Sequence, residues 1–596
     1  MKFPYGISDF KKIVTKGFWY CDRTDRIPLL EKGEYLLFLR PRRFGKSLLV
    51  STLFNYYDVA RADEFETLFG SLAIGENPTP LRNRYLVLKW DFSCVDSSGD
   101  VREIKRALHD HINSSIDAFA LYYKDYLKNP IRIDWDNALN TIHSMTAVVR
   151  AAGHAVYLLI DEYDNFANEV MMGVRDDKRK RYEALVYEEG PLRTLFKTVK
   201  SFTNESLIDR IFITGVSPVV MSDITSGYNI AENIYLDPAF NDLCGFRASE
   251  MESIVRATIE ACGLDDGKVL ETFEIMRTWY NGYKFSVESD ADIYNPTMAL
   301  YFMKTFYETC AYPRQMLDAN LAMDAAKLAF ISAIPKGGQL LLNLVREDDR
   351  IVIDQPADRF GIREMLSEQS KDYAFMVSFL YYFGVLTIGG LTDVGKIALT
   401  IPNLVIRNLY VERIRIMLLP EPADRDEGVR AAEKLYQRGD MEPLAEFVEQ
   451  RYFRVFHNPD YRWANELTVK TAFLTLLYND ILYVMDSEGE IDRRRADLTM
   501  IVRPDMRRFA ILDILIEFKF VTLKDAGLTG EQARRLSLPD LLALPAMAEE
   551  MDAARRQARE YGRALEKRHG NLRLRKYAVV ALGFERIGWT EVDTRP

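Results

Sequence analysis

Cysteine and histidine are scarce in this chain, which limits the kinds of site that it can form. The 596 residues include five cysteines and six histidines, and no two cysteines have the CxxC spacing of a zinc ribbon or a redox pair. Widely separated cysteines are typical of proteins that work in a reducing cytosol. The composition therefore argues against a metal centre built from these residues and predicts a cytoplasmic protein.

An excess of basic residues and a clear membrane span are also missing. The formal net charge is -10, which argues against a bulk-basic nucleic-acid binder but leaves room for local basic patches. The N-terminus, MKFPYGISDF, lacks the charged-then-apolar order of a signal peptide. The uncharged stretch Tyr373–Thr392 is long enough to span a bilayer, but Gly384, Gly389 and Gly390 interrupt it. We expect a buried helix and a β-hairpin there, and no membrane association.

The chain length, the hydrophobic content and the pattern of elements predict an α/β protein of several domains. The chain length predicts roughly three or four domains, and the hydrophobic content of 48% is ordinary for a globular protein. Residues 1–247 alternate strands with helices, which predicts a parallel sheet with helices on both faces. Residues 248–425 look helical and end in a hairpin, like a winged-helix or lid module, with a charged linker at Glu421–Gly428. The strand pattern returns in residues 426–596, which we expect to form a second α/β domain.

Individual elements can be assigned from the same patterns. In the first domain we expect the strands Glu34–Leu39, Tyr85–Phe92, Ala155–Ile160 and Arg210–Thr214 and the helices Ser47–Tyr57 and His109–Tyr126. In the last domain we expect the strands Ala496–Val502, Ile511–Lys519 and Tyr577–Leu582 and the charged helix Pro545–Arg568. Functional residues are then sought where these elements end, because polar groups at strand ends line ligand crevices.

The first candidate site is a phosphate loop. Arg40–Ser47 reads RPRRFGKS and joins an expected strand to an expected helix, which is the context that such a loop requires. Gly45 lets the backbone approach a phosphate, Lys46 would bind the β and γ phosphates, and Ser47 would ligate Mg²⁺. Arg40 stands where the usual motif has its first glycine. The other loop residues that we expect to bind nucleotide are Arg42, Arg43 and Phe44. Taken alone, a Gly-Lys-Ser helix start without a ligand is an equally good interpretation.

A second motif supports the nucleotide interpretation. Val156–Glu162 reads VYLLIDE, an apolar run followed by two carboxylates. Buried parallel strands are apolar throughout, and their carboxyl ends line the ligand crevice. Asp161 is then expected to hold Mg²⁺, and Glu162 to orient and deprotonate the attacking water. The two motifs together predict a nucleoside triphosphatase that uses ATP and Mg²⁺.

A third strand carries hydroxyl groups at its carboxyl end. Arg210–Ser217 reads RIFITGVS. Thr214 or Ser217 would contact the γ-phosphate, and Ser217 is our candidate for nucleotide binding. The alternative is a strand end whose hydroxyls cap the local backbone, and the sequence does not separate the two.

Several motifs together resemble the bacterial AAA-ATPase-like family. They are RPRRFGKS, Tyr20-Cys21-Asp22-Arg23-Thr24, TGVS followed by Cys244-Gly245-Phe246, Trp279–Phe285 (WYNGYKF) and Tyr294-Asn295-Pro296. The resemblance implies an arginine at the position of Arg40. It also implies a C-terminal domain of the PD-(D/E)XK nuclease superfamily, with a restriction-endonuclease-like α/β fold. Tyr20, Asp22 and Thr24 would lie near the base or serve in packing.

The C-terminal domain has a matching set of charged residues. Ile514–Phe520 reads ILIEFKF, and Glu517 and Lys519 point to the same face because side chains alternate along a strand. Asp497 opens the neighbouring strand, so it would join Glu517 around a divalent metal while Lys519 activates water or steadies the phosphate. By resemblance to the nuclease superfamily, Glu466 is a further metal ligand, and Gln557 and Tyr561 match a later helix motif. An edge strand with an ordinary salt bridge would read similarly.

The sequence thus predicts an ATP-binding and ATP-hydrolysing protein coupled to Mg²⁺-dependent DNA cleavage, in a setting such as defence against foreign DNA. Arginine clusters in residues 493–495, 507–508, 555–556 and 573–576 would form a DNA-facing surface or a solvated face. The alternative is a nucleotide-dependent switch or scaffold whose nuclease-like domain only grips DNA or a protein. DNA, a second copy of the chain and a regulatory protein are the expected partners.

Overall fold

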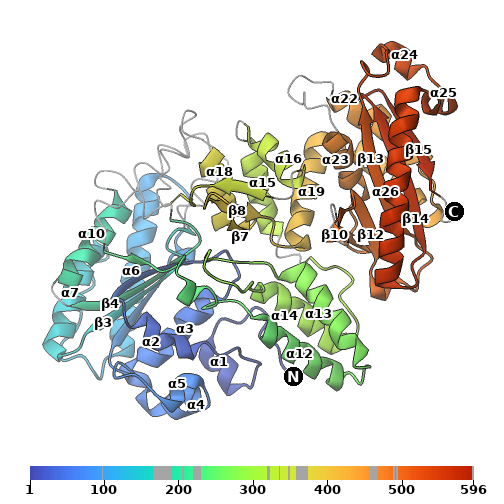
Figure 1. The fold of residues 1–596 in the computed structure, drawn as a ribbon. Helices are drawn as coiled ribbons and strands as arrows, with labels where there is room; N and C mark the ends of the chain where they lie inside the picture. Colours follow the sequence, from blue (N-terminus) through green and yellow to red (C-terminus); the bar gives the residue numbers. More distant parts are fainter. Residues whose placement is uncertain are drawn as a thin grey trace. The chain divides into compact units, whose positions relative to one another are not determined.

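The computed structural model describes residues 1–592 except 97, 166–189, 205–206, 219–229, 318–321, 334–335, 347–349, 358–372, 457–465, 487–489 and 492–493. The described chain forms two compact units, and each is built from two separate segments (Figure 1). The first unit contains Met1–Cys310 and Ile351–Asn403, and the second contains Ala311–Arg350 and Leu404–Pro596. The division into three consecutive domains stays a prediction.

A five-stranded parallel sheet forms the centre of the first unit. Its strand order is β2-β3-β4-β1-β5. The strands are β1 Tyr35–Leu39, β2 Leu86–Asp91, β3 Val156–Asp161, β4 Ile208–Gly215 and β5 Glu232–Asn233. The pairing of β1 with β4 runs from Tyr35 opposite Ile211 to Leu39 opposite Gly215. The expected parallel sheet is therefore confirmed, because each central strand is an apolar run that is buried on both faces.

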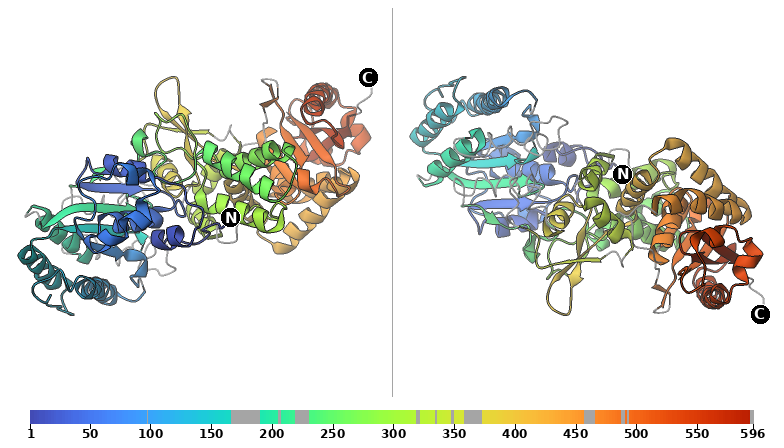
Figure 2. Two further views of the ribbon diagram at one scale, coloured as in Figure 1. Left: turned by 90° about the horizontal axis from the view of Figure 1, so that it is seen from below. Right: turned by 90° about the horizontal axis from the view of Figure 1, so that it is seen from above.

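Helices cover both faces of this sheet. They are α1 Phe10–Thr15, α2 Ile27–Leu30, α3 Lys46–Tyr57, α4 Phe65–Phe69, α5 Ala73–Glu76, α6 Val101–Tyr122, α7 Ala138–Ala152 and α10 Pro191–Asn204. Figure 1 shows α2 and α3 on one side of the sheet and α6, α7 and α10 on the other. Helices α6 and α7 pack against each other, and α6 also packs on the edge strand β2 (Figure 2). Helix α6 starts earlier than expected because Asp100 and Glu103 form a capping box.

Three helices follow the sheet in the first unit. They are α12 Ala248–Ala261, α13 Gly267–Tyr280 and α14 Pro296–Thr309. Asn295 caps α14 by accepting hydrogen bonds from two backbone amides, and Pro296 fits the first turn because it has no amide hydrogen to leave unpaired. A disulfide joins Cys262 to Cys310, which directly follow the last residues of α12 and α14. This pair was not predictable from the sequence, since 48 residues separate the two cysteines.

The uncharged stretch of the sequence forms a helix and a hairpin, as expected. Helix α18 Tyr373–Tyr382 precedes the strands β7 Thr387–Leu391 and β8 Ile397–Thr400, and the additional strand β6 Arg350–Ile353 pairs with β8. Gly384 follows α18 with φ +75°, and a β-carbon there would lie 2.6 Å from Pro41 of the phosphate loop. Within the described ranges, no single helix is long and apolar enough to cross a membrane, although the bent pair Lys327–Ala333 and Gly337–Val345 meets both criteria together.

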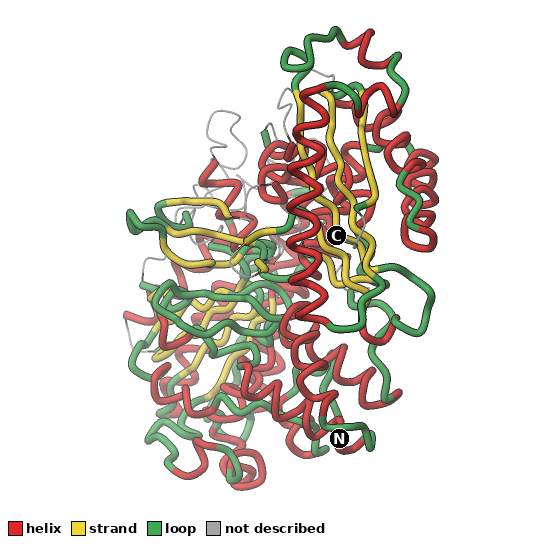
Figure 3. Tube along the Cα trace, turned by 45° about the vertical axis from the view of Figure 1, so that its right-hand side comes forward, coloured by secondary structure: helices red, strands yellow, loops and turns green. Residues whose placement is uncertain are grey.

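The second unit contains a five-stranded mixed sheet in the order β15-β14-β13-β12-β9. The strands are β9 Tyr483–Asp486, β12 Leu498–Val502, β13 Asp513–Val521, β14 Leu574–Leu582 and β15 Arg586–Glu591. Strands β13 and β14 run parallel, and the other pairs are antiparallel. The long helix α26 Pro545–His569 packs along β13 and β14 (Figure 3). The expected C-terminal α/β arrangement is thus present, while its nuclease character stays a prediction.

The second unit contains several further helices. They are α15 Ala322–Ala333, α16 Gly337–Arg346, α19 Leu404–Leu418, α20 Pro422–Arg438, α21 Glu442–Phe447, α22 Phe453–Phe456, α23 Glu466–Leu477, α24 Gly530–Arg534 and α25 Leu538–Leu542. The linker expected at Glu421–Gly428 is wrong, because nearly all of it belongs to α20. Gly428 faces the core, where a β-carbon would lie 2.6 Å from Leu476. Burial of one face overrides the charge of the sequence there.

Candidate functional site

The phosphate loop joins the end of β1 to the start of α3. Arg43 and Gly45 have positive φ angles of 69° and 93°, so the loop turns sharply before the helix begins. The Lys46 ammonium donates hydrogen bonds to the carbonyl oxygens of Arg40 (2.9 Å) and Pro41 (3.0 Å). Burial lowers the pKa of Lys46, and the carboxylates of Glu162 and Asp161 oppose that shift. The loop therefore holds a buried cation close to two acids, which is what a triphosphate site needs.

Arg40, the first residue of the loop, is almost wholly buried and binds several backbone carbonyl groups. Its guanidinium donates to the carbonyl oxygens of Leu39 and Tyr235, each at 2.8 Å, and to that of Phe240 at 2.7 Å. It also lies over the ring of Phe285, 4.0 Å from the centroid. Burial lowers the pKa of Arg40 to about 10. The residue that replaces the first glycine thus ties the loop to the segment that follows β5.

The carboxylates that end β3 lie beside the loop. Asp161 is buried, and its Oδ1 accepts a hydrogen bond from the Thr214 hydroxyl at 2.6 Å. Its Oδ2 is buried and has no hydrogen-bond partner among the described residues. Glu162 has a φ of 50°, an uncommon conformation for this residue type that is often found at active sites. Burial raises the pKa of Glu162, while the charges of Lys46 and Arg42 oppose that shift.

The strand that carries Thr214 is held by a third acid that the sequence did not single out. The Asp164 carboxylate accepts hydrogen bonds from the backbone amides of Val216 (3.1 Å) and Ser217 (2.8 Å) and from the Ser217 hydroxyl (3.0 Å). The Tyr163 hydroxyl donates to the Ser217 carbonyl at 2.6 Å. The Ser217 side chain is therefore turned toward Asp164, and its role in nucleotide binding stays a prediction. In the sequence, Asp164 follows Asp161 by three residues, and this spacing was the signal that could have identified Asp164 as a site residue.

A cavity of about 330 Å³ opens at the start of α3. Its charged and polar lining residues include Arg43, Lys46, Ser47 and Glu162. Its other walls are mostly apolar and include Ile7, Trp19, Tyr20, Phe246 and Leu300. The Thr297 hydroxyl on α14 donates to the Arg43 carbonyl at 3.0 Å, so α14 holds the loop. A cavity lined by both charged and apolar side chains suits a ligand that has an anionic part and an apolar part.

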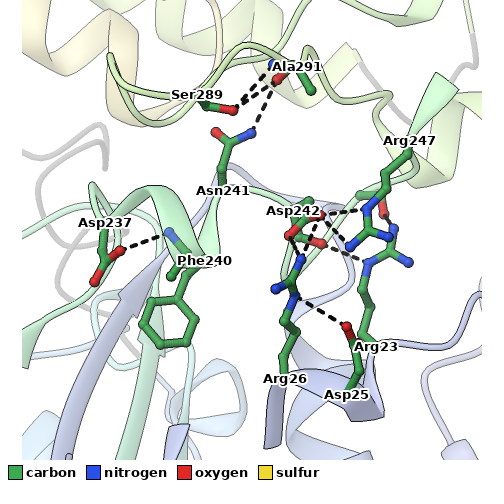
Figure 4. Close-up of polar contacts among 12 residues, drawn as sticks. Arg23, Asp25, Arg26, Asp237, Phe240, Asn241, Asp242, Arg247, Ser289 and Ala291 are labelled. Atoms are coloured by element: carbon green, nitrogen blue, oxygen red, sulfur yellow. Dashed lines mark hydrogen bonds and ion pairs between the residues drawn. The ribbon is translucent and has the colours of Figure 1, made fainter. Parts of the chain in front are cut away.

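One wall of the cavity is fixed by an arginine network (Figure 4). Arg23 donates to the carbonyl oxygens of Asp242 (2.7 Å) and Gly245 (2.9 Å), and it pairs with Glu250 at 2.5 Å. Arg26 and Arg247 both contact the Asp242 carboxylate. The network holds the cavity-lining segment 243–246 against the segment that precedes β1.

Of the three upstream residues considered for the base, one lies at the cavity. Tyr20 lines it. The Asp22 carboxylate accepts from the amides of Thr24 and Ala73, and the Thr24 hydroxyl accepts from the Ile74 amide. Asp22 and Thr24 therefore fix the start of α5, which agrees with the packing alternative.

The second unit brings Asp497 and Glu517 together. Asp497 immediately precedes β12, and Glu517 is buried in β13, next to it in the sheet. The Asp497 amide donates to Glu517 Oε1 at 3.3 Å, and the Asp497 carboxylate accepts from the Phe518 amide at 2.8 Å. Burial and the adjacent Asp497 charge raise the pKa of Glu517 to about 9. Two acids are thus held at one place where the core would otherwise be apolar.

Two lysines accompany these acids. The Lys470 ammonium on α23 lies 3.8 Å from Asp497 Oδ1, and Lys519 lies 3.9 Å from Glu466 Oε1. In the part of the chain that the structure describes, no group of three or more acidic, histidine or cysteine side chains is arranged to hold a metal ion. The metal roles of Glu466, Asp497 and Glu517 therefore stay predictions. The contact of Lys470 with Asp497 was not predicted from the sequence.

The two helix residues predicted beside this cluster lie on α26. Tyr561 packs against Ala496, the neighbour of Asp497, together with Leu515. Gln557 Oε1 is buried without a hydrogen-bond partner among the described residues. An unpaired buried amide oxygen is costly and often marks a functional position.

The basic clusters are largely paired within the chain. Arg507 makes two hydrogen bonds to Asp513, Arg575 pairs with Glu591, and Lys576 lies 3.0 Å from Glu566. Most of the cluster at residues 493–495 falls outside the described residues or their described side chains. The paired charges support the solvated-face alternative more than a DNA surface.

The N-terminal part of the chain is similar to a family of predicted ATPases. Residues 4–225 match the family described as Predicted AAA-ATPase. The chain is 24% identical over 546 residues to an "uncharacterized protein in vnfD 5′ region" of Azotobacter chroococcum mcd 1, which covers 89% of this chain and 92% of that protein. The structure of the Aeropyrum pernix ORC1 protein in complex with DNA aligns with 65% of this chain and 90% of its own, at 11% identity and a TM-score of 0.25.

Proposed function

We propose that the first unit binds and hydrolyses ATP at the phosphate loop. The observation that carries this proposal is that Lys46 and Glu162 line one cavity, while the buried Asp161 carboxylate acts on the Lys46 charge. Lys46 binds the β and γ phosphates, and the amides at the start of α3 bind phosphate oxygens. Glu162 orients the attacking water and accepts its proton.

The same site has suitable ligands for Mg²⁺. Ser47 lies in the cavity wall, and Oδ2 of the buried Asp161 carboxylate accepts no hydrogen bond from the described residues, its nearest cation being Lys89 Nζ at 3.9 Å. Hydroxyl and carboxylate oxygens are the donors that Mg²⁺ prefers. Bound Mg²⁺ supplies positive charge that offsets the charge of the β and γ phosphates.

Replacement of Lys46 tests this function. We expect Lys46→Ala to weaken ATP binding by at least about tenfold and to remove turnover, because the buried ammonium is the main cation at the phosphates. Isothermal titration with ATP and a phosphate-release assay measure the two effects. The matched control is Lys105→Ala, an exposed lysine on α6. Tight ATP binding by Lys46→Ala would contradict the assignment of the site.

For the second unit we infer a metal-dependent phosphodiesterase site at Asp497 and Glu517. The specific observation in its favour is the pair of adjoining carboxylates, one of them buried, with Lys519 two residues along the strand. Two acids held together favour a bound cation, because their mutual repulsion is relieved by positive charge. A divalent ion supplies charge stabilisation for a phosphodiester that is being cleaved. Lys519 would steady the scissile phosphate, and ATP binding in the first unit would control the reaction.

Asp497→Ala tests the second function. We expect at least about a hundredfold slower cleavage of plasmid, linear duplex or single-stranded DNA in Mg²⁺ or Mn²⁺, because one of two carboxylate ligands is lost. The control is Asp525→Ala, which removes an exposed carboxylate just beyond β13. The assay is run with and without ATP, and cleavage by Lys46→Ala would exclude nucleotide control. DNA or protein binding without any cleavage by the unaltered chain would support the switch alternative.

A further inference from the structure

The phosphate loop carries two neighbouring arginines, which point to different surroundings. Arg43 lines the cavity, and its carbonyl is held by Thr297 of α14. Arg42 instead donates from Nη2 to Asn165 Oδ1 at 2.5 Å. Because Asn165 lies just beyond the end of β3, Arg42 reaches across from the loop to the strand that carries the catalytic acids.

Asn165 connects Arg42 to Glu162. The Asn165 amide donates to the Glu162 carbonyl at 2.9 Å, so a tight turn joins the two residues. Asn165 is almost fully buried, which restricts the positions that its side chain can take. Burial raises the pKa of the Glu162 carboxylate, and the positive charges of Lys46 and Arg42 lower it. Arg42 is therefore tied to the turn that carries Glu162, the proposed base.

Acidic groups outnumber the cations around this point. The carboxylates of Asp161, Glu162 and Asp164 act on Lys46, and Lys89 lies 3.9 Å from Asp161 Oδ2. During hydrolysis the water oxygen bonds to the γ-phosphorus and the bond to the β–γ bridging oxygen breaks. The water proton passes to Glu162, and ADP and phosphate leave. Negative charge on the transferred group is stabilised most by a guanidinium, which in many enzymes of this type comes from another subunit or protein.

We propose that Arg42 supplies this guanidinium from within the same chain, with Asn165 as its positioning residue. The inference rests on the proposed ATP hydrolysis and deepens it. Its consequence is that each phosphate-loop site is complete in one chain. Turnover per chain is then independent of whether a second copy is bound.

The first test compares Arg42→Ala and Arg42→Lys with the unaltered chain. We expect kcat for ATP to fall by about 100-fold or more in Arg42→Ala, with KM changed less than about threefold, because the contact forms mainly in the transition state. Arg42→Lys keeps the charge and is expected to recover part of kcat. Asn165→Ala is expected to lower kcat about tenfold with KM unchanged. Thermal melting checks the fold, and the exposed Arg106→Ala on α6 is the control.

A second readout does not depend on turnover. We expect Arg42→Ala to bind ADP as the unaltered chain does but to lose affinity for ADP with aluminium fluoride, a mimic of the transferred phosphate, by about 100-fold. Equal loss of affinity for both ligands would overturn the proposal, because it would show a ground-state role.

Mixing two inactive variants separates action within a chain from action between chains. A complex of Arg42→Ala with Lys46→Ala contains an intact Lys46 site next to a neighbour with an intact Arg42. We expect no recovery of ATP turnover in the mixture. Recovery of turnover would overturn the proposal, since the arginine would then act on a neighbouring site. A lack of turnover in the unaltered chain would instead refute the proposed function itself.

Discussion

Replacing Glu162 by glutamine is expected to stop ATP turnover while leaving ATP bound. The carboxylate is the proposed base, and positioned bases contribute about 10²- to 10⁴-fold to such reactions. Glutamine has nearly the same shape and can still adopt the left-handed backbone that Glu162 has at φ 50°. Phosphate release should therefore fall by about that factor, whereas the dissociation constant for ATP measured by titration calorimetry should stay nearly constant.

The pH dependence gives an independent check on the same residue. Burial raises the pKa of Glu162, and Lys46 and Arg42 only partly oppose this. A base must be deprotonated to act, so turnover by the unaltered chain should decline as the pH falls through this raised pKa. The residual turnover of Glu162→Gln should not show that decline.

The control for this substitution is Glu252→Gln, which removes an exposed carboxylate of α12 that pairs with its neighbour Arg256. A Glu162→Gln protein that turns over ATP within about threefold of the unaltered chain would exclude Glu162 as the base.

Restoring a glycine at position 40 is expected to destabilise the protein and not to improve the phosphate loop. Arg40→Gly removes a buried guanidinium that donates to the carbonyl oxygens of Leu39, Tyr235 and Phe240. These carbonyls would then lack a donor, and each unpaired buried group costs about 1–3 kcal/mol. We expect a loss of about 3–5 kcal/mol, similar to breaking a buried polar pair.

Urea or thermal denaturation measures the change for Arg40→Gly, followed by fluorescence. Arg40→Lys should fall between the two proteins, because an ammonium keeps the charge but cannot reach several carbonyls at once. The exposed Arg106→Ala is again the control. Unchanged stability together with tighter ATP binding in Arg40→Gly would contradict an anchoring role for Arg40.

The difference between what the sequence could and could not predict is clear at the phosphate loop. Gly45, Lys46, Asp161 and Glu162 were identifiable because the motif and the strand end are each contiguous in the sequence. The partners of Arg40 were not, since Tyr235 and Phe240 lie about 200 positions further along the chain. The hydrogen bond between Arg42 and Asn165 likewise depends on β1 and β3 belonging to the same sheet, where β4 lies between them.

The second unit shows the same division. The alternating pattern of β13 placed Glu517 and Lys519 on one face of a strand. The contact of Lys470 with Asp497 was not predictable, because it depends on how α23 packs against the sheet. Helix α20 was not predicted, because its sequence is highly charged and its buried face is recognisable only from the elements that pack against it.

The sequence by itself therefore determined the local elements, the phosphate loop and the acids that end its neighbouring strand. Their signals are periodicity, capping and short motifs, which arise from interactions between residues close in the chain. Only the tertiary structure decided which groups are paired. It fixed Ser217 on Asp164, joined Cys262 to Cys310, and set Lys470 beside Asp497. These contacts join distant segments, whose approach depends on the packing of whole elements and leaves no local pattern in the sequence.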